Sequence, residues 1–482
     1  MSSGLTYKFS LAGVCLLLLT GAGFIQNALN VQRTELGLTN VTPLENAPPI
    51  LALTTQALGS FRGLIANALW IRANDLQLQD KFFEQVQLAD WITKLEPRFV
   101  QVWIVQAWNM AYNISVKLNT AEDRWRWVQR GIELLRDEGL KYNPNESLIY
   151  RELAWFFQHK MGAELDEYHN YYKGAWAEEM TGVLGSAHPQ WAEFIHPQTE
   201  DAKRRATLLR EKYKLDPVRM KAVDDHWGPL DWRLPEAHAI YWANLGLEKS
   251  KPDQLITLRR VIYQSMDIAF KRGNLFTGAD GRVRLGPNLA VADKANQAYI
   301  EMMTEDKDPT KVNAYRVAHK NFLKNATYNL YIYNRLAEAQ RFFNLMRAKY
   351  PDAAPANQSL AEFAFERATE DVQGMSMGRT TALVQAFVTQ SYLSLINDQE
   401  DQAEAYMLRA REFYDLYVKK TSGSQRIAIP PLEEVKRETL RQMQDPKNGY
   451  LPAVIEKLQK RLGLPPTPPP SGSAQTAAPA GG

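Results

Sequence analysis

The sequence predicts an all-α protein made of successive helical hairpins in two halves, with one small β-hairpin between the halves. Over most of residues 50–445, apolar residues recur at intervals of three and four, which is the spacing of amphipathic helices. Pro97 and Asn143-Pro144-Asn145 separate consecutive helical segments. Strand-like apolar runs occur convincingly only within residues 273–288, where they flank Asp280-Gly281, a dipeptide typical of tight hairpin turns.

Changes of pattern divide the chain into seven segments. Residues 215–235 are rich in Pro, Asp and Trp, and we expect them to be irregular. The final segment is a low-complexity tail that cannot form a core, so we expect it to be disordered. In order, the segments are an apolar N-terminal segment (1–30), a Pro-containing linker (31–49), an aromatic-rich helical half (50–272), the β-hairpin insertion (273–290), a second helical half (291–445), a short C-terminal helix (446–464) and the tail (465–482).

The N-terminal segment predicts the location of the protein. No charged residue lies between Lys8 and Arg33, and residues 11–25 are almost wholly apolar. A membrane-spanning helix needs roughly 20 apolar residues, and the core of a signal peptide needs roughly 7–15. We expect a single-pass transmembrane anchor, with a cleaved signal as the alternative. In either case the bulk of the chain is expected to be extracytoplasmic, in the periplasm.

Composition and motifs argue against several functional classes. The 57 Lys and Arg residues nearly balance the 54 Asp and Glu residues, and a net charge of +3 argues against general nucleic-acid binding. The single cysteine, Cys15, lies in the apolar segment, which leaves no thiol elsewhere for disulfides, zinc or nucleophilic catalysis. Residues 374–378 match the nucleophile-elbow pattern G-x-S-x-G, but a helical pattern precedes them and no histidine follows. We expect no enzyme, no cofactor and no nucleic-acid partner.

Several helical segments resemble the tetratricopeptide repeat (TPR). In NRLAEAQRFFNLMRAKYPD, Ala339, Phe343 and Pro351 match the second helix of that repeat in residue type and spacing, although Met346 stands where a small residue is usual. The segment EDQAEAYMLRAREFYDLY places Ala403, Met407 and Ala410 at matching intervals without the closing proline, and PEAHAIYWANLGLE resembles a first helix. The resemblance implies a divergent, membrane-anchored member of this superfamily. It also implies a superhelix that binds proteins or peptides in its concave groove.

The first group of candidate binding residues lies in the segment WIVQAWNMAYN. It consists of Trp103, Trp108, Asn109 and Tyr112. Trp108 and Tyr112 are four residues apart, so they share a helix face. Exposed aromatic rings beside an amide would suit a glycan or an extended peptide. The alternative is that these rings fill wide gaps between helical hairpins.

The second group lies in the segment DDHWGPLDWRLPEAH. Two imidazoles and a carboxylate could bind zinc or iron if this loop brought them together, but no histidine pair has the H-x-x-x-H spacing. We expect a structural joint without metal, in which Asp231 pairs with Arg233 and His238 packs between repeats. The candidate residues are His226, Trp227, Asp231, Trp232, Arg233 and His238.

The sequence thus favours a membrane-tethered helical-repeat scaffold that binds protein or peptide partners in an extracytoplasmic envelope assembly. One alternative is a module that binds a glycan or envelope polymer through the Trp-rich N-terminal half. A second alternative is a metal-dependent enzyme centred on residues 224–238. The sequence does not indicate an oligomeric state.

Overall fold

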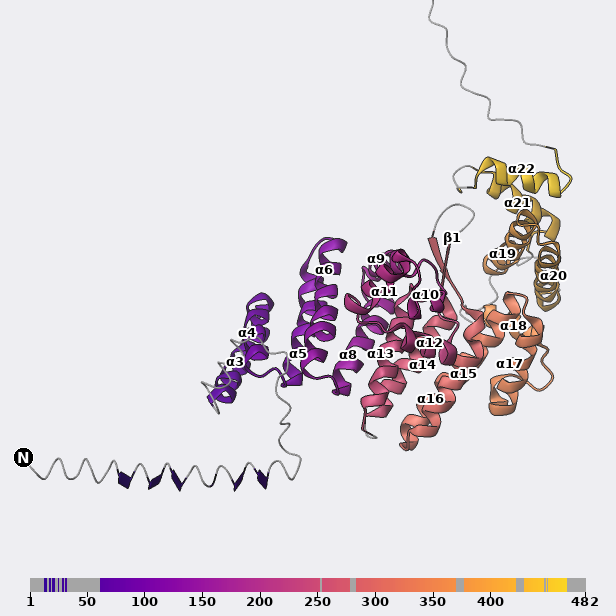
Figure 1. Ribbon diagram of the computed structural model, residues 1–482. Helices are drawn as coiled ribbons and strands as arrows, with labels where there is room; N and C mark the ends of the chain where they lie inside the picture. Colours follow the sequence, from indigo (N-terminus) through magenta and orange to yellow (C-terminus); the bar gives the residue numbers. More distant parts are fainter. Residues whose placement is uncertain are drawn as a thin grey trace, which may run out of the picture. The chain divides into compact units, whose positions relative to one another are not determined.

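The computed structural model describes residues 61–465, except for 252–253, 278–282, 370–376, 422–428, 446–447 and 449, together with single residues between 13 and 32. This part of the chain is mostly helical and contains one two-stranded antiparallel sheet (Figure 1). The predicted all-α fold with one small β-hairpin is therefore confirmed. The chain separates into two compact units, residues 1–102 and 103–482, so both sides of the hairpin belong to the second unit.

Several predicted features fall outside these residues. Residues 33–49 of the linker, the tail from residue 466 onward and most of the N-terminal segment are not described. The expected turn at Asp280-Gly281 and residues 374–376 of the G-x-S-x-G pattern also lie outside the described residues. Among the described residues, no helix is long and apolar enough to cross a membrane.

From residue 61 onward, the first unit forms a helical hairpin. Helix α3 (Phe61–Leu78) and helix α4 (Phe82–Leu95) are joined by a tight turn in which Asp80 has a φ of 58°. The core of the hairpin consists of Ala66, Ala89, Ile92 and Val102, with Leu69, Trp70 and Phe99 packed against it.

The remaining elements follow one another as short-linked helices. They are α5 (Val100–Trp108), α6 (Ala121–Glu133), α7 (Leu140–Tyr142), α8 (Ser147–Trp155), α9 (His169–Leu184), α10 (Trp191–Ile195), α11 (Glu200–Glu211), α12 (Pro217–Trp227), α13 (Pro235–Lys249), α14 (Leu255–Arg272), β1 (Asn274–Thr277), β2 (Val283–Gly286), α15 (Ala292–Glu305), α16 (Pro309–Ile332), α17 (Leu336–Lys349), α18 (Leu360–Thr369), α19 (Met377–Ile396), α20 (Glu400–Thr421), α21 (Leu432–Gln444) and α22 (Pro452–Arg461). Three π-helical turns extend α5, α6 and α8, at Asn109–Ile114, Leu134–Gly139 and Phe156–Gly162. Short 3-10 turns lie at Ser115–Lys117, Leu289–Val291 and Pro351–Ala353.

Helix α12 corrects the expectation that residues 215–235 are irregular. The Asp216 side chain caps the helix by accepting a hydrogen bond from the Val218 N–H at 2.9 Å. Pro217 occupies the first turn, where its missing N–H costs nothing. Met220, Val223 and Trp227 then form a buried face at helical spacing. The density of Pro, Asp and Trp obscured an ordinary capped helix, and within 215–235 only residues 215–216 and 228–234 are irregular.

The β-hairpin pairs β1 with β2 in antiparallel register. Leu275 lies opposite Leu285, and Phe276 lies opposite Arg284. The Phe276 ring lies over Gly286, and a Cβ atom at Gly286 would lie 2.7 Å from the ring, so a larger residue there would displace the exposed Phe276 side chain.

Aromatic side chains fill much of the interior of the second unit. Six of its tryptophans are buried, and Trp176 packs edge-to-face on the imidazole of His238 at 5.0 Å. Phe343, one of the positions that resemble a repeat, is also buried and lies 5.4 Å from the ring of Phe363. The buried tryptophans are Trp103, Trp125, Trp176, Trp227, Trp232 and Trp242.

Candidate functional site

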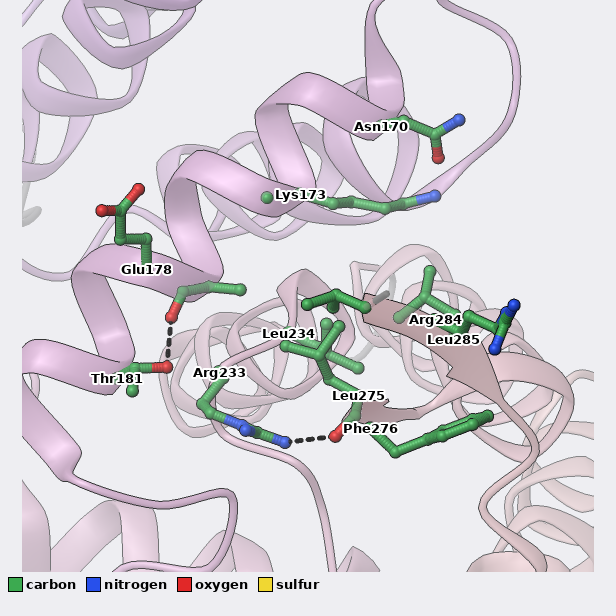
Figure 2. Close-up of a pocket in the computed structure, with 13 residues that line it drawn as sticks. Asn170, Lys173, Glu178, Thr181, Arg233, Leu234, Leu275, Phe276, Arg284 and Leu285 are labelled. Carbon is green, nitrogen blue, oxygen red and sulfur yellow. Dashed lines mark hydrogen bonds between the residues drawn. The ribbon is translucent and has the colours of Figure 1, made fainter. Parts of the chain in front are cut away.

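A pocket of about 960 Å³ lies between α9 and the β-hairpin (Figure 2). One face of α9 forms one wall, and both strands with the connection that precedes α13 form the rest. Small side chains of α9, Gly174 and Ala177, leave room between the helix and the hairpin. The lining residues are Asn170, Lys173, Gly174, Ala177, Glu178 and Thr181 from α9, Arg233 and Leu234 from the connection, and Leu275, Phe276, Val283, Arg284 and Leu285 from the hairpin.

A buried ion pair fixes the connection beside the pocket. The guanidinium of Arg233 binds both carboxylate oxygens of Asp231, with Nη2 at 2.6 Å from Oδ2 and Nε at 2.8 Å from Oδ1. The Asp231 side chain is 1% exposed and that of Arg233 is 18% exposed. Hydrogen bonding to Asp231 raises the pKa of Arg233. The predicted pairing of Asp231 with Arg233 is confirmed.

The same ion pair holds the first strand of the hairpin. Arg233 Nη2 donates a hydrogen bond to the carbonyl oxygen of Leu275 at 2.7 Å, which Figure 2 shows as a dashed line. The Leu275 N–H donates in turn to Asp231 Oδ2 at 3.1 Å. The two side chains therefore occupy the outer edge of β1 as a neighbouring strand would. Nearby, Asn288 Nδ2 donates to the carbonyl oxygen of Pro229 at 2.7 Å, which ties the end of the hairpin to the connection again.

Lys173 places a buried amine at the wall of the pocket. The residue is 4% exposed, and its Nζ lies 3.2 Å from Nδ1 of His169. Burial lowers the pKa of Lys173 to about 8, although the nearby charge of Glu236 opposes the shift. Among the described residues, no carboxylate lies within ion-pair distance of its Nζ. The Lys173 amine is thus desolvated and lacks a direct anionic partner.

Glu236 lies in the interior at the start of α13. It is 3% exposed, and its Oε2 has no hydrogen-bond partner. Burial raises the pKa of Glu236, while Lys173 and Arg272 oppose the shift. Its charge can interact with Lys173 only at a distance.

Most predicted residues of the loop 224–238 belong to the core. Trp227 and Trp232 are fully buried, and His238 is 0% exposed with its Nε2 at 2.9 Å from the carbonyl oxygen of Trp232. His226 is exposed, and its Nε2 lies 3.9 Å from Glu301 Oε1. The described residues contain no group of three His, Cys, Asp or Glu side chains that could hold a metal ion.

The predicted aromatic group separates into a buried part and a half-buried part. Trp103 and Asn109 are buried, and Trp103 stacks on Tyr142 at 6.0 Å. Trp108 and Tyr112 are half-buried and stack on each other at 4.3 Å, so the predicted shared face is confirmed. The Trp108 indole Nε1 donates to Glu152 Oε2 at 2.6 Å.

Two further rings extend this half-buried pair. The hydroxyl of Tyr112 lies 3.2 Å from His159 Nδ1, and the His159 imidazole stacks on Trp155 at 4.6 Å. We call the four side chains Trp108, Tyr112, His159 and Trp155 the aromatic strip. The sequence analysis missed Trp155 and His159, although their four-residue spacing repeats that of Trp108 and Tyr112.

The pocket residues of α9 and the hairpin were also missed. One local signal could have indicated a recess. Gly174 and Ala177 are small residues on one face of a helix that is otherwise rich in aromatic residues. The hairpin lies about a hundred positions further along the chain, and no spacing rule connects it with α9.

Comparisons with family models, with curated proteins and with solved structures each find no match for this chain. The resemblance to the tetratricopeptide repeat therefore stays a prediction.

Asp231→Ala should destabilise the protein. The substitution leaves the partly buried Arg233 guanidinium and the Leu275 N–H without their acceptor, and breaking a buried pair in this way costs about 3–5 kcal/mol. Asp225→Ala is the matched control, because Asp225 pairs with Lys221 in solvent, where ion pairs contribute up to about 1 kcal/mol. Urea unfolding followed by circular dichroism measures both. Equal, small losses for the two variants would contradict the structural role of Asp231.

His238 should make stability depend on pH. Its Nε2–H donates to the Trp232 carbonyl, and its Nδ1 is buried without a hydrogen-bond partner. Protonation of Nδ1 would therefore create a buried imidazolium charge with no partner for the new N–H. Burial accordingly lowers the pKa of His238 to about 4, against about 6.5 in the unfolded chain. Between about pH 4 and pH 6.5 the unfolded chain binds this proton and the folded chain does not. The contribution of His238 to the free energy of unfolding is therefore complete above about pH 6.5 and is lost as the pH falls towards 4.

Urea unfolding at a series of pH values between 7.5 and 4.5 measures this dependence. At about 1.4 kcal/mol per pKa unit, His238 contributes up to about 3 kcal/mol. His319, whose pKa burial also lowers to about 4, should contribute similarly. In the variant His238→Gln, the free energy of unfolding should therefore depend on pH less steeply than in the unaltered protein, but the dependence should not disappear. An unchanged slope in that variant would show that His238 does not titrate as the structure requires.

Proposed function

We propose that this chain is a membrane-tethered helical-repeat scaffold that binds a protein or peptide partner in an extracytoplasmic assembly. The pocket between α9 and the hairpin carries the proposal. Its volume is about 960 Å³, and its walls combine aliphatic side chains with a small number of polar groups, as ligand-binding sites usually do. Lys173, Glu178 and Arg284 supply charged groups that can fix the orientation of a bound segment.

The rigidity of the pocket walls supports binding of a peptide. The face of α9 belongs to a sixteen-residue helix, and the hairpin is held by the Asp231–Arg233 pair. A site formed before its ligand arrives loses less conformational entropy on binding. A segment of a partner can therefore enter without reorganising the scaffold.

The tether is part of the proposal and is supported by the N-terminal segment. The described residues between 13 and 32 are helical. Apolar side chains among them are exposed, including Leu17 at 73% and Leu18 at 68%. Exposed aliphatic side chains in a segment without charge are favourable in a bilayer and unfavourable in water.

The aromatic strip favours a second candidate function, the binding of a glycan or envelope polymer. Half-buried rings with neighbouring polar groups, such as the Tyr112 hydroxyl and the His159 imidazole, can stack on a sugar ring and hydrogen-bond to it. The predicted residues Trp108 and Tyr112 form half of this surface.

Photo-crosslinking in intact cells should distinguish the two functions. A photoreactive amino acid at Glu178, an exposed pocket residue, should give a discrete protein adduct. The same residue at Glu211, exposed and outside the pocket, is the control and should give none. A third position, His159, tests the aromatic strip. Carbohydrate-positive adducts from His159, with none from Glu178, would favour the glycan-binding function and contradict the peptide-binding one.

The tether predicts that the whole protein fractionates with membranes and is extracted by detergent and not by alkaline carbonate. Deleting residues 1–30 should release a folded, mainly helical protein into the soluble fraction, because the apolar segment is removed and the described helices remain. Mass determination of the native protein supplies the decisive control. A soluble protein that begins near Phe24 would show that the segment is a cleaved signal.

A further inference from the structure

The two strands of the β-hairpin have chemically different outer edges. At the outer edge of β1, the N–H and C=O groups of Leu275 both bind the Asp231–Arg233 pair. Because these groups point away from β2, Leu275 occupies a non-hydrogen-bonded position of the antiparallel ladder. Its cross-strand partner Leu285 must then also point its N–H and C=O groups away from the hairpin, at the outer edge of β2. The same holds for Val283, two residues away.

The outer edge of β2 is unpaired in the described part of the chain. Neither Val283 nor Leu285 forms a hydrogen bond through these outward backbone groups. Both residues line the pocket, together with the face of α9 (Figure 2). An exposed strand edge of this kind is a template for pairing with another extended chain.

The surroundings of this edge indicate what kind of chain would pair with it. Leu275, Leu285 and Val283 occupy alternate positions, so they present aliphatic side chains on one face of the hairpin. Lys173 adds a desolvated amine that has no carboxylate within ion-pair distance among the described residues. An extended peptide with apolar side chains at alternate positions and one carboxylate would satisfy both features.

We propose that an extended segment of the partner protein adds to β2 as a third strand and places an acidic side chain or its C-terminal carboxylate at Lys173. This inference rests on the proposed peptide-binding function and specifies its mode. The chain's own tail is a poor occupant, because residues 465–482 contain no acidic side chain for Lys173 and no Leu, Val or Ile for the aliphatic face. Pairing with β2 of a second copy is the competing arrangement.

The test selects peptides from a displayed library of random decapeptides on the full-length protein in detergent and measures their affinity by fluorescence anisotropy. Selected peptides should alternate apolar residues and carry one acidic residue. N-methylation of one peptide residue after another should weaken binding at every second position by about tenfold, because each lost hydrogen bond is worth about 1.4 kcal/mol. The positions between them should tolerate the methyl group.

Two pairs of variants locate the peptide on the protein. Leu285→Pro removes the outward N–H without removing a hydrogen bond of the hairpin, so it should weaken binding about tenfold, whereas Leu285→Ala, which keeps the N–H, should weaken it less. Lys173→Gln should abolish the preference for an acidic residue in the peptide. Lys203→Gln, on the exposed side of α11, should preserve that preference.

Three results would overturn the inference. Peptides that bind in the pocket without a two-residue period in the N-methylation scan exclude strand addition but leave the proposed function intact. A dimer that Leu285→Pro converts to a monomer assigns the edge to a second copy of the chain. Failure to enrich any peptide, together with no crosslink from Glu178, removes both the inference and the proposed function. The N-methylation scan needs no protein variant, so it decides the matter even if Leu285→Pro does not fold.

Discussion

The carboxylate of Asp231 and the guanidinium of Arg233 bind each other through two hydrogen bonds and the backbone of Leu275 through two more. A two-stranded hairpin is marginally stable on its own in water, so its position depends on what holds it against the helices. Removing these charges from water is costly, and the added bonds to the Leu275 N–H and C=O groups help to offset that cost. The wall of the pocket opposite α9 therefore depends on this ion pair, and the hydrogen bond from Asn288 to Pro229 supports the end of the hairpin.

Occupation of the β1 edge has a consequence for function. With the outward backbone groups of Leu275 bound by side chains, another strand meets less competition at the outer edge of β2, whose residues Val283 and Leu285 line the pocket. The pocket thereby combines the outward N–H and C=O groups of β2, aliphatic side chains and the buried amine of Lys173. Such a combination favours one orientation of a bound segment, because a reversed peptide would misplace its carboxylate.

Local sequence patterns predicted the features that depend on neighbours in the chain. Helical periodicity predicted the helices, and the Asp280-Gly281 dipeptide between apolar runs predicted the paired strands. The two-residue separation of Asp231 and Arg233 predicted their pairing. Spacing also predicted that Trp108 and Tyr112 share a face, but it could not show that Trp103 is buried. Burial depends on which helices pack outside, and a single sequence does not contain that information.

The pocket could not be predicted for the same reason. It joins α9 to strands about a hundred residues away, and the depressed pKa of Lys173 arises from burial in the assembled fold. In α12, by contrast, the capping residue Asp216 and the first-turn proline were present in the sequence, and the surrounding prolines and tryptophans concealed them.

The difference between the two strand edges is the central claim, and amide hydrogen exchange with residue-level mass spectrometry tests it most directly. In the free protein, the Leu275 N–H should exchange slowly, because it donates to Asp231, and the Leu285 N–H should exchange at a rate close to that of an open strand. Adding a selected peptide should slow exchange at Leu285 and leave Leu275 unchanged. Protection of Leu285 in the free protein, or equal exchange at both positions, would contradict the account.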